Sequence, residues 1–150
     1  MILLPRRCLL AIAAVTDIAL NARPRPVAAK ALAARHRLPP RHLETLLQSL
    51  VHTRILKGVR GPHGGYELAR ERRKISAGEI VRAAMSASAE GSDGEGGRSG
   101  LIDLVVTPLV EAAGQSFLRQ LDAISVEDLV RDAESLFPDP ASAAADQFQI

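Results

Sequence analysis

The chain has 150 residues, which is about the length of one domain, and with 47% hydrophobic and 24% charged residues it can bury a core. Its longest strongly apolar stretch, residues 8–15, is too short to cross a bilayer. Its only cysteine, Cys8, excludes an intramolecular disulfide and any four-cysteine metal site built from one chain. One Tyr, three Phe and no Trp disfavour a base-stacking sheet of the RNA-binding type. The net charge of +2 combines +11 on residues 1–75 (twelve Arg and three Lys against four acids) with −9 on residues 76–150. This asymmetry indicates a polyanionic partner such as nucleic acid for the basic half, and the alternative is that the charges merely fall unevenly on solvated faces.

The first predicted helix contains residues 8–15 and continues to about Asn21. Arg6 and Arg7 before an apolar run imitate a secretory signal peptide. Asp17 interrupts that run, however, and apolar side chains follow helical spacing across it, at Ile12, Val15, Ile18 and Ala19. We therefore expect a packed first helix in a cytoplasmic protein rather than an export signal.

Two further helices are predicted, from Val27 to about His36 and from Pro40 to about Thr53. Pro26 fits the first turn of the former, and Pro39 is held extended by the proline after it. The latter helix carries an apolar stripe at i, i+3, i+4 and i+7, formed by Leu43, Leu46, Leu47 and Leu50. Two short helices joined by a tight turn are typical of a helix-turn-helix, in which the second helix enters the DNA major groove.

The outward face of this third helix offers polar side chains that could contact DNA bases. The residues expected to do so are Pro40, Arg41, His42, Glu44, Thr45 and Gln48. Arginine pairs best with guanine and glutamine with adenine, while glutamate can accept a hydrogen bond from cytosine. Arg6 and Arg7 are expected phosphate contacts, and an ordinary solvated side chain is the alternative for each residue.

A hairpin is predicted next, with strands over residues 55–59 and 66–69 and a turn rich in glycine and proline between them. The glycines are expected for the geometry of the turn. After a helix-turn-helix such a hairpin forms a wing, and Arg60 suits a narrow, electronegative minor groove. The expected wing contacts with DNA are Lys57, Arg60, Gly61, Pro62, His63, Gly64, Gly65 and Tyr66.

The acidic half is predicted to contain a helix from Ser76 to Ala89, opened by a capping box of Ser76 and Glu79. A long apolar helix from Leu101 to about Leu121, kinked or restarted at Pro108, would need a second subunit to cover it. Ser125 caps a last helix that ends at Leu136. The predicted domains are a DNA-binding domain over residues 1–89, a flexible glycine-rich linker over 90–100, dimerisation and final helices over 101–136, and a disordered tail over 137–150.

Residues 43–47 and 55–69 together resemble the Rrf2 family of winged-helix regulators, of the IscR, NsrR and CymR type. The most specific part is the stretch from Val59 to Tyr66, with its Val-Arg-Gly-Pro-x-Gly-Gly-Tyr order, and the resemblance extends over about residues 6–130. It implies a mainly α fold with a small β-hairpin wing, in which a winged helix-turn-helix precedes a long C-terminal dimerisation helix. It also implies a dimeric, sequence-specific repressor.

The chain departs from this family at several positions. Members that sense iron-sulfur status, nitric oxide or iron usually place three cysteines before the long helix, where residues 90–104 contain none. We therefore expect no iron-sulfur cofactor. Leu9 and Leu10 occupy positions where most relatives have a basic residue and Tyr, and Pro39 or Pro40 replaces the usual Ser at the start of the recognition helix.

The sequence thus predicts a homodimeric transcriptional regulator that binds double-stranded DNA, represses from a palindromic operator and needs no cofactor. One alternative is a regulator of the same fold that responds to a small ligand or a partner protein. Another is a winged-helix interaction module that has lost DNA binding. No metal site, membrane partner or catalytic constellation is predicted, because the four histidines lack metal-ligand spacing and no paired carboxylates or Ser-His-Asp set emerges.

Overall fold

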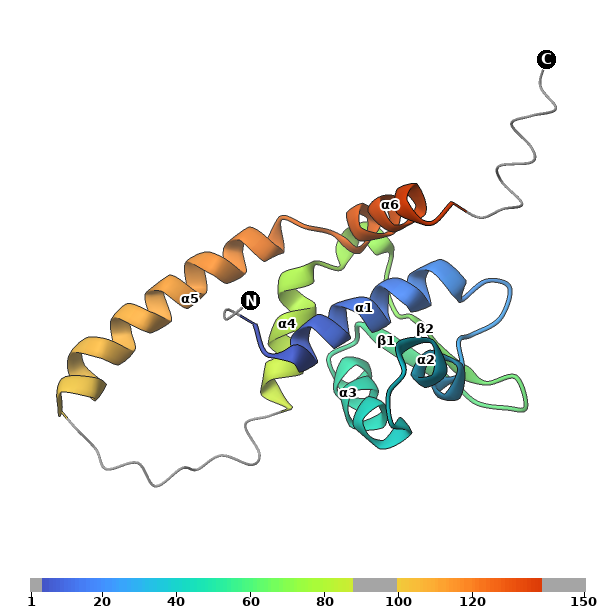
Figure 1. Cartoon of the computed structure of the whole chain (residues 1–150), viewed down its shortest axis with the longest axis horizontal. Coiled ribbons are helices and arrows are strands. Elements are labelled where there is room, and N and C mark those ends of the chain that lie inside the picture. The colour runs from blue at the N-terminus through green and yellow to red at the C-terminus, as the bar shows by residue number, and fades with distance from the viewer. Residues whose placement is uncertain (1–3, 88–99, 139–150) are drawn as a thin grey trace, which may run out of the picture.

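The structure is a computed structural model that describes residues 4–87 and 100–138. The elements follow in the order α1 (Arg6–Asn21), α2 (Ala29–His36), α3 (Pro40–His52), β1 (Leu56–Val59), β2 (Gly65–Leu68), η1 (Arg72–Lys74), α4 (Ala77–Ser86), η3 (Ile102–Val106), α5 (Thr107–Asp122) and α6 (Val126–Leu136). Figure 1 shows α2, α3 and the two strands below α1, with α6 above it and α5 extending away as a long arm. The predicted fold class, mainly α with a small hairpin, is confirmed.

The core lies against one side of α1, and the buried side chains of this helix gather on that side. They are Cys8, Ala11, Ala14, Val15, Asp17, Ile18 and Ala19. The predicted leucine stripe of α3 packs into the same core, and none of its four side chains is more than 3% exposed. The apolar run near the N-terminus is therefore a core helix. No helix in the described part of the chain is long and apolar enough to cross a membrane.

The start of α2 differs from the sequence prediction. The helix begins at Ala29 rather than at Val27, and Val27 instead forms an antiparallel bridge with Tyr66 of β2. Two backbone hydrogen bonds of 2.9 and 2.8 Å join these two residues. These bonds satisfy the backbone N–H and C=O groups of Val27 while the residue is extended. Neither bond would form if a helix began at Pro26.

The turn between α5 and α6 is joined to the residues before α4 by backbone hydrogen bonds. Ala77 donates to the carbonyl of Ile124 and Val126 donates to that of Ile75, each over 2.8 Å. These bonds belong to an antiparallel bridge between Ser76 and Ser125. Each of these serines opens the helix after it with a capping box, as the sequence predicts for Ser76 and Glu79, and Ser125 caps α6 as expected. Val126 and Val130 are at most 1% exposed, so α6 shares the core formed by α1, α3 and α4.

The long helix contains an irregular turn immediately before Pro108. Proline has no N–H group, and its ring clashes with the carbonyl four residues earlier in a regular helix. The π-helical segment η3 precedes α5, and Thr107 donates to the carbonyl of Ile102, five residues back. Such a π-bulge accommodates the proline without ending the helix. The predicted linker up to residue 99 and the predicted tail from residue 139 lie outside the described residues.

Candidate nucleic-acid interface

Helix α3 separates its apolar and polar residues cleanly. Pro39 is extended, with φ −62° and ψ 133°, and Pro40 occupies the first helical turn, as predicted. The leucine stripe faces the core, while the predicted base-contacting residues all lie exposed to solvent: Pro40, Arg41, His42, Glu44, Thr45 and Gln48. Helix α3 thus presents one polar face of the kind that enters a major groove.

The first turn of α1 lies beside the first turns of α3. A cavity of about 400 Å³ opens between them, lined by Arg6, Arg7, Leu10, Leu38, Arg41, His42, Thr45 and Leu46. The two arginines expected to contact phosphate therefore share one hollow with Arg41 of the polar α3 face. Three arginines therefore line a single hollow, and arginine is well suited to bind an anionic group such as a phosphate.

The hairpin has the geometry of a wing. Strands β1 and β2 pair antiparallel, with Lys57 opposite Glu67 and Val59 opposite Gly65. Gly61 adopts φ +121°, a conformation that side chains disfavour, and the turn leaves Arg60 and the neighbouring residues through His63 exposed. Lys57 is exposed but pairs with Glu67 over 3.0 Å, so its charge is shared within the wing.

Gly65 allows the wing to pack against the segment before α2. A Cβ atom at Gly65 would overlap the backbone of Val27 and lie 2.8 Å from the backbone nitrogen of Ala28. The Val27–Tyr66 bridge is next to this close approach, so the turn end of β2 is held against the segment before α2. Tyr66 itself is half-buried and packs on the core.

A buried carboxylate sets the position of α2 relative to α1. Asp17 of α1 accepts hydrogen bonds from Arg35 over 2.9 and 2.6 Å, and from His36 over 2.9 Å and Asn21 over 3.0 Å. Burial by itself would raise the pKa of Asp17, but the hydrogen bonds and charge of Arg35, with the bonds from Asn21 and His36, outweigh it and lower that pKa. The ionised carboxylate therefore fastens the last turn of α2 to α1.

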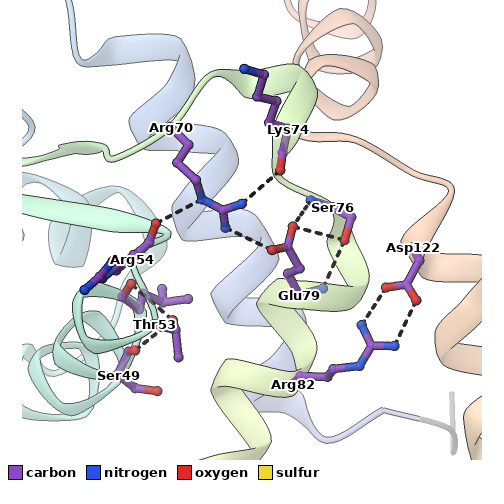
Figure 2. A network of polar contacts seen from close by, with 10 residues as sticks. Ser49, Thr53, Arg54, Arg70, Lys74, Ser76, Glu79, Arg82 and Asp122 are labelled. Atoms are coloured by element: carbon purple, nitrogen blue, oxygen red, sulfur yellow. Dashed lines mark hydrogen bonds and ion pairs between the residues drawn. The ribbon is translucent and has the colours of Figure 1, made fainter.

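A second polar network fastens the wing and α3 to α4 (Figure 2). The guanidinium of Arg70, just after β2, donates to the carbonyls of Arg54 and Lys74 over 3.2 and 3.1 Å, and to Glu79 over 2.9 Å. Arg54 follows α3 and has φ +60°. Burial would raise the pKa of Glu79, but hydrogen bonds from Ser76 and from Arg70 lower it overall. Arg70 thus connects the end of α3, the exit of the wing and the start of α4.

The base of α5 is joined to α4 by a two-pronged ion pair. Arg82 donates to both carboxylate oxygens of Asp122, over 2.6 and 2.8 Å, and lowers the pKa of that carboxyl (Figure 2). Gly78 makes room for this pair, because a Cβ atom there would overlap the Asp122 carboxylate. Sequence reasoning missed these three networks, since their partners lie far apart in the chain.

Within the described residues, no group of three or more His, Cys, Asp or Glu side chains is arranged to hold a metal ion. Cys8 is fully buried, and burial raises the pKa of its thiol, with Arg7 opposing that effect.

Comparison with known proteins shows which proteins this chain is similar to. The family model Rrf2, described as an iron-dependent transcriptional regulator, matches residues 4–132. The Synechocystis protein slr0846, named as an HTH-type transcriptional regulator, is 36% identical over 81% of this chain and 83% of its own length. The regulator IscR of Klebsiella pneumoniae is 30% identical over 84% of this chain and 78% of its own length.

Solved structures agree with the sequence relatives. IscR of T. potens superimposes with a TM-score of 0.68 and 29% identity, covering 91% of both chains. The global cysteine regulator CymR of B. subtilis shares the fold, with a TM-score of 0.65 and 22% identity over 87% of this chain and 98% of its own. The sequence relatives are named as HTH-type transcriptional regulators, and a regulator of this kind is not an enzyme. The chain therefore belongs to the Rrf2 family of winged-helix transcriptional regulators.

Proposed function

We propose that this chain is a cytoplasmic regulator, two copies of which bind a palindromic operator. The bound dimer represses transcription by occluding a promoter. The observation that carries this proposal is the position of Arg6, Arg7 and Arg41 around one hollow beside the exposed polar face of α3. Arginines on the phosphates would supply affinity and its salt dependence. The α3 face and Arg60 of the wing would supply sequence preference.

The exposed apolar side of the long helix supports a homodimer. Large hydrophobic side chains lie exposed along η3 and the start of α5: Leu101, Ile102, Leu104, Val105, Val106, Leu109 and Val110. A contiguous apolar strip of this kind is costly to leave in water and marks a protein interface. A twin helix from a second copy would cover it, and a two-fold dimer matches the symmetry of a palindromic site.

We also propose that the regulator works without an iron-sulfur cluster, although the matching family model carries the description iron-dependent. Such clusters are held mainly by cysteine thiolates. The chain has a single cysteine, and Cys8 is fully buried in the core with the pKa of its thiol raised. The residues therefore do not fit a cluster, and regulation must use another signal.

Selection of bound fragments from a random DNA pool by the purified full chain tests the function. Enrichment of a two-fold-symmetric motif by a colourless protein supports it. The variant Arg60→Ala should then bind the selected motif about 1–3 kcal/mol more weakly while its thermal unfolding is unchanged. Unchanged affinity would remove Arg60 from the interface.

The same selection separates the alternatives. If only added cell extract allows a motif to be enriched, a small ligand or partner protein controls binding. A third outcome is that no motif emerges even with extract and that any remaining affinity for DNA does not fall steeply as salt rises. The chain is then a protein-interaction module. A brown protein with visible absorption would contradict the proposal that no cluster is bound.

A further inference from the structure

The segment between α1 and α2 has the sequence Arg23-Pro24-Arg25-Pro26 and lies beside the wing. Figure 1 shows this loop and the β1–β2 turn at the same end of the molecule. The bridge between Val27 and Tyr66 holds the end of the loop against β2. The loop therefore has a fixed position relative to the wing.

The two arginines of this loop reach different parts of the wing. One guanidinium nitrogen of Arg25 lies 3.5 Å from Nδ1 of His63, in the wing turn. Arg23 instead lines a hollow at the base of the wing together with Glu67 and Glu71. Arg25 thus adds positive charge near the turn, whereas Arg23 lies near acidic side chains.

The charge of Arg25 has no counterpart in the described part of the chain. No carboxylate there lies within 4.0 Å of Arg25 or of Arg60, whereas Lys57 and Arg35 each have one. The contact with His63 is long for a hydrogen bond, so the guanidinium keeps its donors for another acceptor. Exposed cations gathered without anions favour a polyanion at this end of the wing.

We propose that Arg25 is a further DNA-binding residue, which contacts a backbone phosphate beside the minor groove that the wing enters. This inference rests on the proposed function and extends the predicted interface of α3, the wing and the start of α1. A phosphate contact anchors the wing without selecting a base. The loop before α2 therefore adds one phosphate contact next to those of the wing.

The test compares Arg25→Ala, Arg25→Lys and Arg23→Ala, using the full chain and the DNA motif selected by the unmodified protein. Affinity is measured by fluorescence anisotropy over a range of salt concentrations. Loss of one phosphate contact lowers the slope of log K against log salt by about 0.9, and by about 1.8 for a dimer. We expect this change for Arg25→Ala, with about three- to tenfold weaker binding to selected and mismatched DNA alike.

The controls separate the inference from its rivals. Arg25→Lys should keep the slope, and Arg23→Ala, which removes the same charge from the same loop, should leave slope and affinity unchanged. Equal effects of both alanine variants would show that only net charge matters and would overturn the assignment. A wild-type slope for Arg25→Ala, or a loss confined to the selected motif, would overturn it as well. Failure of the unmodified protein to bind any DNA would instead refute the proposed function.

Discussion

Replacing Asp17 by alanine is expected to lower the free energy of unfolding by about 2–3 kcal/mol. The Asp17 carboxylate is 10% exposed and accepts hydrogen bonds from Arg35, His36 and Asn21. Removing one partner of a fully buried ion pair costs about 3–5 kcal/mol. The cost is smaller here because Arg35 is 44% exposed, so water can solvate the freed guanidinium.

Urea unfolding followed by circular dichroism measures this loss, and a double-mutant cycle assigns it. Asp17→Ala, Arg35→Ala and the double variant should show a coupling energy of at least about 1 kcal/mol at pH 7. Losses that add to within about 0.5 kcal/mol would refute the claim that this pair holds α2 to α1.

The same pair predicts a pH dependence. The pKa of Asp17 is lower in the folded chain, so the unfolded chain binds a proton at this position more readily. The stabilisation is therefore complete at neutral pH and is lost as the pH falls below about 4, through the folded pKa. The stability difference between the unmodified protein and Asp17→Ala should narrow over that acidic range and stay constant from pH 5 to 8.

Three further predictions concern single side chains. Gly65→Ala would place a methyl group against the backbone of Val27, so urea unfolding should show a loss of more than about 2 kcal/mol. Gly58→Ala, where an added Cβ meets nothing within 4 Å, should cost less than about 1 kcal/mol, and equal losses would contradict the close approach. The Cys8 thiol should react with a thiol reagent in urea but far more slowly in the folded protein, because it is fully buried and its pKa is raised; rapid reaction of the folded protein would place it at the surface. Leu104→Glu, at a side chain 79% exposed, should shift the protein from dimer to monomer in sedimentation velocity, and an unchanged dimer would exclude this part of the long helix from the interface.

Local patterns in the sequence predicted most helices correctly, because each depends on neighbours within one or two turns. The stripe from Leu43 to Leu50 specifies the buried face of α3. Pro40 specifies the start of α3, and the serines before α4 and α6 specify theirs through capping boxes. The order of Gly and Pro after Val59 specifies the wing turn.

Long-range contacts decided the features that sequence reasoning missed. Val27 after Pro26 fits a helix start as well as a strand, and only its partner Tyr66, far along the chain, selects the strand. Asp17 was visible as a charge within an apolar run, but nothing local identifies Arg35 as its partner. The candidate DNA contacts were chosen from side-chain chemistry and from the order of residues in the wing, and they lie on the exposed face of α3, on the hairpin and on the first turn of α1.

The anchoring of α5 at one end has a mechanical consequence. The Asp122 end is joined to the DNA-binding half by Arg82 and by the backbone bridge, while the helix runs about 30 Å from there back to Ile102. In a dimer joined near Ile102, α5 is a lever, and each degree of rotation about the joined end displaces the anchored Asp122 end by about 0.5 Å relative to the two-fold axis. Half-sites on DNA repeat about every 34 Å. A rotation of about 10° would move each DNA-binding half by about 5 Å, so the angle at which α5 meets the two-fold axis would set the spacing of the two proposed recognition helices.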